Sequence, residues 1–218
     1  MKYRYLTFDC YGTLIDWKAG IVKELRAAVK GTHLSDQELF NTYVAAERNQ
    51  ESTYKRYREV LRDTALTMSG IFEAAVDPSA AEAFAASVPK WPAFGDTRSF
   101  LLEMGSRGYK RYILSNVDDD LLEETIKNNG LEVDGFVTAE QVGSYKPRPD
   151  HWLELMRRTG APKEQILHLA QSVFHDIIPT QQLGISSAWT NRYNERFPKD
   201  ASPLLVADSL FSLASVLE

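Results

Sequence analysis

Residues 3–13 have the sequence YRYLTFDCYGT, in which a short run of β-forming and apolar residues ends at Asp9. The Tyr11-Gly12-Thr13 segment that follows is typical of a tight turn. A strand over residues 3–8 would therefore deliver the Asp9 carboxylate to its carboxyl end. Taken alone, a strand-terminal aspartate more often caps a turn than acts as a catalytic residue. Other segments of the sequence are needed to distinguish the two roles.

Further short apolar runs end in the same way, and amphipathic stretches lie between them. The predicted strands are 109–114, 135–138, 166–170 and 186–189, and the predicted helices are 97–107, 121–129, 152–159 and 174–183. Strands that alternate with helices indicate a parallel sheet. We therefore predict an α/β fold built on a Rossmann-like, doubly wound parallel sheet.

Residues from about 16 to 90 interrupt this alternation, because they show helical periodicity only. The segment contains the capping box Ser35-Asp36-Gln37-Glu38, which predicts the start of a long helix. Since the insertion directly follows the first strand, we expect it over the carboxyl ends of the sheet, where such folds bind ligands. We predict a catalytic core of residues 1–15 and 91–218 and an inserted all-helical cap domain of residues 16–90.

Composition restricts the class of function. A chain of 218 residues with a net charge of −5 can bury a full core but offers no broad basic face for a phosphate backbone. No segment reaches the ~18 apolar residues that a membrane span requires. Cys10 is the only cysteine, so an intramolecular disulfide is excluded and a reducing compartment is expected. We predict a cytoplasmic protein with no nucleic-acid or membrane partner.

Polar residues also follow three other predicted strands. Ser115 and Asn116 follow the second strand, Lys146 lies in the loop after the third, and Asp176 begins the helix after the fourth. Each has a structural alternative: a strand-to-helix cap, a solvated loop lysine and an acidic helix start. Because the carboxyl ends of parallel strands meet at one edge of a sheet, these residues and Asp9 together predict a single site.

The order of these residues resembles the haloacid dehalogenase superfamily across essentially the whole chain. Asp9, Ser115, Lys146 and Asp176 match its four sequence motifs, and residues 16–90 match its helical cap. The resemblance implies that Asp9 is a covalent nucleophile that Lys146 keeps ionised. The predicted catalytic residues are Asp9, Thr13, Lys146 and Asp176.

Two positions depart from the phosphatases of that superfamily. Those enzymes usually carry a second aspartate two positions after the nucleophile, where this chain has Tyr11, and an acidic magnesium ligand in the last motif, where it has Gln171. Mg²⁺ requires hard anionic oxygens to offset its dehydration, and a neutral amide is a poor replacement. The aspartates of residues 118–120 are assigned to the dipole of the helix that they open. We therefore predict no metal and no cofactor.

Displacement at an sp³ carbon tolerates both changes, because a departing halide needs neither a proton nor a metal. The Asp-x-Tyr-Gly-Thr motif resembles the type II branch, the L-2-haloacid dehalogenases. The resemblance implies that Asp9 attacks the α-carbon of a small 2-substituted carboxylate and that water then hydrolyses the ester. Ser115 would bind the substrate carboxylate, Asn116 would face the leaving group, and Asp176 would position Lys146 or water.

Several positions leave the substrate pocket open. The dehalogenases have serine and asparagine where this chain has Gln171 and Val173, and an aromatic residue where it has His175. Arg48 is the nearest candidate for their cap arginine, with a solvated helix arginine as the alternative, and Trp17 either lines the pocket or packs beside the cap hinge. The predicted substrate-binding residues are Tyr11, Trp17, Arg48, Ser115, Asn116, Gln171 and His175.

Three functions therefore stay open. The first is a metal-independent 2-haloacid dehalogenase-type hydrolase acting on a small-molecule carboxylate, with a homodimer left open. The second is carbon–nitrogen ring opening, because residues 7–17, 91–94, 142–147 and 175–176 resemble the azetidine-2-carboxylate hydrolase branch more closely. The third is a non-catalytic binding or regulatory protein that kept the fold. A magnesium-dependent phosphatase ranks below the first two.

Overall fold

The computed structural model describes residues 2–28, 33–51, 53–72, 76, 78–215 and 217. The chain divides into two compact units. The core unit comprises Met1–Asp16, Ala93–Asn116 and Asn129–Glu218, and the helical unit comprises Trp17–Pro92 and Val117–Asn128. The placement of residues 16–90 as a cap over the site stays a prediction.

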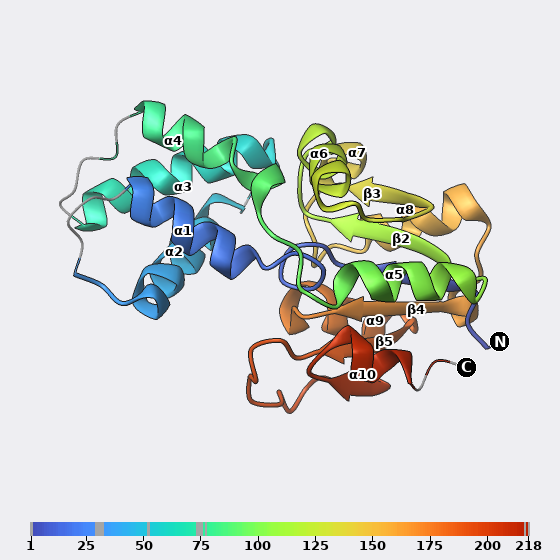
Figure 1. Ribbon diagram of the computed structural model, residues 1–218. Helices are drawn as coiled ribbons and strands as arrows, with labels where there is room; N and C mark the ends of the chain where they lie inside the picture. The colour runs from blue at the N-terminus through green and yellow to red at the C-terminus, as the bar shows by residue number, and fades with distance from the viewer. Residues whose placement is uncertain are drawn as a thin grey trace. The chain divides into compact units, whose positions relative to one another are not determined.

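A six-stranded sheet forms the centre of the core unit, with every neighbouring pair parallel (Figure 1). Its order is β3-β2-β1-β4-β5-β6. The strands are β1 Tyr5–Phe8, β2 Lys110–Ser115, β3 Gly135–Thr138, β4 Ile166–Ala170, β5 Ser186–Thr190 and β6 Leu205–Ala207. The predicted parallel sheet and its first five strands are confirmed. The three-residue strand β6 was missed.

Helices cover the sheet of the core unit. They are α5 Thr97–Ser106, α7 Ala139–Val142, α8 Asp150–Thr159, α9 Ile178–Leu183 and α10 Leu210–Ala214, with shorter helical turns η2 Lys163–Gln165 and η3 Val173–Ile177. Helices α5 and α10 pack against each other, although more than 100 residues separate them in the chain (Figure 1). Right-handed crossovers between parallel strands place α8 and α9 on the opposite face. The sheet is therefore doubly wound, as predicted.

The strand order reverses between β1 and β4. The chain runs outward through β2 and β3, returns, and then runs outward on the other side through β4, β5 and β6. Such a switch point leaves a crevice outside the carboxyl ends of the two central strands. Asp9 directly follows β1 and Gln171 directly follows β4. The topology therefore brings distant segments of the chain together at one edge of the sheet.

The helical unit consists of helices and their connections in its described residues. They are α1 Trp17–Ala28, α2 Asp36–Gln50, α3 Tyr57–Phe72, α4 Pro78–Ala85, η1 Val88–Lys90 and α6 Asp119–Asn129, of which the last residue belongs to the core unit. The predicted capping box opens α2: the Glu38 N–H donates to Ser35 Oγ at 3.3 Å, and the Ser35 N–H donates to Glu38 Oε2 at 2.8 Å. No helix in the described ranges is long and apolar enough to cross a membrane.

Asp118 corrects the prediction for the aspartate triplet. Its buried carboxylate accepts the backbone N–H groups of Tyr57 at 2.9 Å and Arg58 at 3.0 Å, so it caps α3 rather than its own helix. The first N–H groups of a helix have no partner within the helix, and an anion there is stabilised. Asp119 and Asp120 lie in the first turn of α6, as predicted.

Candidate active site

Lys146 is the centre of the candidate site, and its side chain is almost completely buried. The ammonium group donates to Asp9 Oδ1 at 2.8 Å, to Asp176 Oδ1 at 2.7 Å and to the Leu114 carbonyl at 2.9 Å. An ammonium carries three hydrogens, so each of them has an acceptor. All four residues belong to the core unit. The structure thus brings together three of the four predicted catalytic residues around one buried cation.

Thr13 joins them through Asp9. Its hydroxyl donates to Asp9 Oδ2 at 3.0 Å and accepts the backbone N–H of Gln171 at 2.9 Å. The turn between these residues passes through Gly12, whose φ of 101° lies in the region that glycine adopts without strain. One oxygen of the Asp9 carboxylate therefore accepts from the Lys146 ammonium, and the other accepts from the Thr13 hydroxyl. The backbone N–H of Gln171, directly after β4, fixes the orientation of that hydroxyl.

Asp176 lies in η3, the turn that follows β4, and is fully buried. Its Oδ1 accepts from Lys146 and from His168 Nε2, the latter at 2.9 Å. Its Oδ2 is buried and has no hydrogen-bond partner among the described residues. The other ring nitrogen of His168 lies 2.8 Å from Thr7 Oγ1. The sequence prediction missed His168 and Thr7, although a histidine inside the apolar run ILHLA was a signal for a buried polar pair.

The charges of the cluster shift its pKa values in opposite directions. Burial, reinforced by the nearby Asp176, raises the pKa of Asp9 above 3.8, against the pull of Lys146 and Thr13. Although burial opposes ionisation, Lys146 and His168 hold the pKa of Asp176 well below its ordinary value. Burial likewise opposes the charge on Lys146, but the two carboxylates raise the pKa of its ammonium. The cluster therefore holds a permanent cation and one carboxylate that protonates more readily than the other.

Ser115 ends β2 beside the lysine, and Asn116 directly follows the strand. Ser115 is buried and its Oγ has no partner within the described part of the chain. The Asn116 amide is paired twice with the backbone of Lys146: it accepts the N–H at 2.7 Å and donates to the carbonyl at 3.1 Å. Buried His151 binds the Ser115 carbonyl at 3.1 Å, and burial followed by the Lys146 charge lowers the pKa of His151 to about 3. Neutral His151 and Asn116 thus fix the loop that supplies Lys146.

Gln171 and His175 are positioned by neighbouring polar groups. The Gln171 side-chain amide donates to Glu195 Oε1 at 3.1 Å, and the backbone carbonyl of Gln171 accepts from Trp189 Nε1 at 2.8 Å. The backbone N–H of His175 donates to Ser172 Oγ at 3.1 Å, and the same hydroxyl lies 3.0 Å from His175 Nδ1. Glu195 was not predicted, since it lies 24 residues after Gln171 in a connection without regular structure. Gln171 therefore lies beside a carboxylate.

The remaining predicted residues are Tyr11, Trp17 and Arg48. Tyr11 is partly exposed and forms a β-bridge with Ile15 in the turn after Asp9. Trp17 and Arg48 belong to the helical unit. Trp17 begins α1 and packs edge-on against Phe40, with ring centroids 5.0 Å apart, and Arg48 lies exposed in the last turn of α2. Their contact with a substrate stays a prediction.

A magnesium ion does not fit the donor set of this cluster. Asp9 and Asp176 each give an oxygen to Lys146, and the side chain of Gln171 is neutral. No group of three or more histidine, cysteine, aspartate or glutamate side chains that could hold a metal occurs among the residues described. Mg²⁺ is held by hard anionic oxygens. The described site therefore offers two carboxylates that share an ammonium, with a neutral amide at Gln171.

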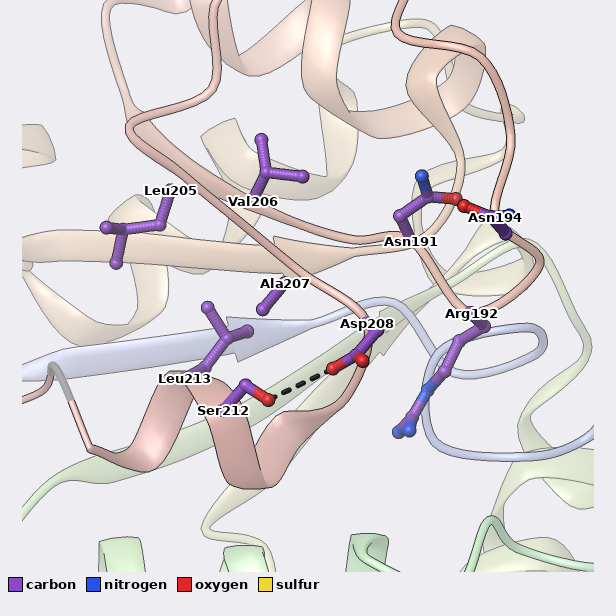
Figure 2. A pocket seen from close by; sticks show the side chains of 9 residues that line it. All are labelled: Asn191, Arg192, Asn194, Leu205, Val206, Ala207, Asp208, Ser212 and Leu213. Carbon is purple, nitrogen blue, oxygen red and sulfur yellow. Dashed lines mark hydrogen bonds between the residues drawn. The ribbon is translucent and has the colours of Figure 1, made fainter.

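A hollow of about 630 Å³ lies elsewhere in the core unit, lined by residues after β5, by β6 and by α10. Figure 2 shows Arg192 at the opposite end of this hollow from Leu205. The Arg192 guanidinium donates to the Thr13 carbonyl at 2.9 Å and to Asp96 at 2.7 and 2.8 Å. None of the predicted catalytic residues lines the hollow. Arg192 therefore connects this hollow with the candidate site, because it holds the backbone carbonyl of Thr13 in the turn after Asp9.

Comparison with known proteins identifies relatives. A family model described as haloacid dehalogenase-like hydrolase matches residues 3–178. The (S)-2-haloacid dehalogenase of Pseudomonas fluorescens is 24% identical over 96% of this chain and 94% of that protein. The haloacid dehalogenase-like hydrolase domain-containing protein 3 of Danio rerio is 28% identical over 59% of this chain and 54% of its own length.

A similar fold occurs in a solved structure, the L-2-haloacid dehalogenase of Xanthobacter autotrophicus with chloropropionic acid covalently bound. It superposes with a TM-score of 0.87 at 20% identity, over 98% of each chain.

Proposed function

The chain belongs to the haloacid dehalogenase-like hydrolase family, and we propose that within it Asp9 is a nucleophile for metal-independent displacement at the α-carbon of a small 2-substituted carboxylate. The resemblance inferred from the motifs agrees with this membership. The observation that carries the proposal is the buried Lys146 ammonium, 2.8 Å from Asp9 Oδ1. Its charge favours the ionised, nucleophilic form of the carboxylate where an ion would otherwise be desolvated.

The first step is a displacement. An oxygen of the Asp9 carboxylate forms a bond to the substrate α-carbon, and the carbon–halogen bond breaks with its electron pair leaving on the halide. Halide needs no proton, so the absence of an acidic side chain at Tyr11 is no obstacle. Ser115 Oγ, buried and unpartnered in the described structure, supplies a donor for the substrate carboxylate. Asn116 is proposed to face the leaving group with the N–H that Lys146 does not use.

The second step hydrolyses the ester. The oxygen of water bonds to the Asp9 Cγ, and the bond between Cγ and the ester oxygen breaks. Asp176 orients the water, and the proton that the water loses passes to the departing alkoxide to give the 2-hydroxy acid. Asp176 Oδ2 is suited to this task because it has no partner among the described residues. Asp9 regains its carboxylate form by releasing one proton to solvent.

Halide release tests the proposal directly. Purified protein is incubated with each enantiomer of 2-chloropropionate, with and without EDTA, and chloride and lactate are measured. We expect release that EDTA does not reduce and that Asp9→Asn abolishes. Magnesium-dependent hydrolysis of phosphate esters, with no halide release from any small 2-haloacid, would overturn the proposal.

A second candidate is the opening of a strained cyclic amino acid, which the carboxylate at Glu195 favours. Gln171 stands where the dehalogenases have serine, and its side chain donates to Glu195 Oε1 at 3.1 Å. A carboxylate beside this position suits a cationic ring nitrogen better than a halide. In this reaction Asp9 would attack the carbon that carries the ring nitrogen, and the nitrogen would leave as a primary amine. Appearance of that amine from azetidine-2-carboxylate distinguishes it from dehalogenation.

A covalent adduct also separates both candidates from a binding protein that merely kept the fold. Mass spectrometry of acid-quenched protein is expected to detect an ester on the Asp9 peptide with either substrate class. A protein that binds these carboxylates without any adduct or product would instead be a non-catalytic member of the family.

A further inference from the structure

His168 is a fully buried histidine in the middle of β4, and none of the steps above uses it. It is the register partner of Thr7 on β1, and His168 Nδ1 lies 2.8 Å from Thr7 Oγ1. Its Nε2 lies 2.9 Å from Asp176 Oδ1, and its ring packs edge-on against Trp152 at 5.3 Å. Both polar ring atoms are thus engaged, and the ring is packed in place.

The partners of His168 define its tautomer. An ionised carboxylate can only accept a hydrogen bond, so Nε2 must carry the hydrogen that points to Asp176. In the neutral form of the imidazole, Nδ1 then keeps its lone pair, to which the Thr7 hydroxyl can donate. Hydrogen bonds therefore run from Thr7 through His168 to Asp176, whose Oδ1 also accepts from Lys146.

These hydrogen bonds determine which oxygen of Asp176 is paired. Two donors converge on Oδ1, which leaves Oδ2 as the oxygen without a partner among the described residues. Without His168, rotation of the carboxylate could exchange the two oxygens at Lys146. Asp9 does not depend on His168 in the same way, since its own donors are Lys146 and Thr13.

We propose that His168, held in one tautomer by Thr7, is a positioning residue that fixes Asp176 for hydrolysis of the Asp9 ester. This role rests on the proposed function, in which Asp176 orients the attacking water. It predicts that losing His168 slows the second step more than the first, because only the second step uses Asp176 Oδ2.

Rapid-quench kinetics with 2-chloropropionate provide the test. His168→Phe keeps a ring but removes both hydrogen bonds, and we expect steady-state turnover to fall about 10- to 100-fold, the rate equivalent of one hydrogen bond to a charged group. The first-turnover burst of chloride should persist while the Asp9 ester accumulates. His168→Gln, whose amide can still donate to Asp176, should restore part of the turnover.

Thr7→Val tests the tautomer, and Thr125→Val is its matched control. Thr125 is an equally buried threonine whose hydroxyl donates to the Leu121 carbonyl, far from this chain of hydrogen bonds in sequence and in the other unit. We expect ester to accumulate in Thr7→Val but not in Thr125→Val. Equal losses of the chloride burst and of turnover in His168→Phe, without accumulation of ester, would overturn the role. If His168→Phe does not fold, the Gln and Thr7→Val variants decide by the same measure.

A readout that needs no substrate separates this inference from the proposed function. The carboxyl ¹³C resonance of Asp176 is titrated in the wild type and in His168→Gln and His168→Phe. Loss of the donor should raise the pKa of Asp176 in His168→Phe, with a smaller change in His168→Gln. An unchanged titration contradicts the positioning role. A wild type that gives neither ester nor product with any substrate contradicts the proposed function, whatever the titration shows.

Discussion

Each unit contains a cluster around buried carboxylates, and the two clusters offset the cost of burying a carboxylate in different ways. In the core unit, Asp9 and Asp176 share the Lys146 ammonium. In the helical unit, Glu47 is buried, and the hydroxyls of Tyr43 and Tyr57 each donate to its Oε1 at 2.7 Å. Removing a carboxylate from water is costly unless it is paired and hydrogen-bonded. The core cluster has a cation to offset that cost, and the tyrosines of the helical cluster are neutral.

The difference is visible in the direction of the pKa shifts. Burial raises the pKa of Glu47, and the two tyrosine hydroxyls only partly oppose it. Asp176 is more completely buried than Glu47, yet Lys146 and His168 hold its pKa well below the ordinary value. Asp9 lies between the two cases, since burial raises its pKa while Lys146 and Thr13 oppose the rise. Asp176, which accepts from both Lys146 and His168, is therefore shifted toward the ionised form, whereas Glu47, which accepts from neutral hydroxyls, is shifted toward the protonated form.

The largest effect is expected from exchanging each carboxylate for its amide. Asp9→Asn removes the nucleophile, and halide release should fall on the order of 10⁴-fold or more. Glu47→Gln makes the same change in the helical unit and should keep most of the activity. Steady-state kinetics of both variants, with circular dichroism to verify folding, check this. Comparable losses in the two variants would break the comparison.

Removal of the cation should have the next largest effect. Lys146→Met keeps a chain of similar length but leaves two carboxylates buried without a counter-ion. We expect the free energy of unfolding at neutral pH to fall by about 3–5 kcal/mol, as when one partner of a buried ion pair is deleted. Urea unfolding measures it. A variant as stable as the wild type would mean that Lys146 does not offset the burial of these charges.

The pH dependence of activity tests whether the pKa of Asp9 lies between those of Asp176 and Glu47. Burial, with the charge of Asp176, raises the pKa of Asp9 above 3.8, so protonation inactivates the nucleophile at a pH above that value. Activity should fall with a slope of one as pH decreases through the raised pKa. Thr13→Val removes a hydrogen bond that lowers this pKa, so the acid limb should move to higher pH. An acid limb that moves to lower pH in Thr13→Val contradicts the assignment.

The smallest effect is expected in the stability of the helical unit. Because the folded-state pKa of Glu47 is raised above 4.5, its contribution to stability is fully present below the unfolded-state pKa and is lost as pH rises through the folded-state value. Glu47→Gln cannot ionise and should lack this loss. Unfolding free energies of both proteins across this pH range test it, with an expected difference of about 1 kcal/mol. Parallel pH profiles would show that Glu47 titrates as in the unfolded chain.

The sheet could largely be predicted from the sequence, because short apolar runs between amphipathic stretches indicate strands directly. Five of the strands and the longer helices follow from it, whereas β6, α7 and α10 span only three to five residues and carry too little pattern. Asp9, Lys146 and Asp176 were found together because each follows a predicted strand. His168 escaped because its partner Thr7 is set by the register between β1 and β4, 161 residues apart in sequence. Asp118 escaped for the same reason, since it caps a helix that starts 61 residues earlier.

The route of one water oxygen tests the central claim, that Asp9 is a covalent nucleophile, most directly. A single turnover of 2-chloropropionate is run in H₂¹⁸O with the protein in excess, and both the product and the Asp9 peptide are analysed by mass spectrometry. We predict one ¹⁸O atom in the Asp9 carboxylate and unlabelled lactate, because the product oxygen comes from Asp9 in the first turnover. Label in the lactate, with an unlabelled Asp9 peptide, would mean that water attacks the substrate directly and would contradict the nucleophilic role of Asp9.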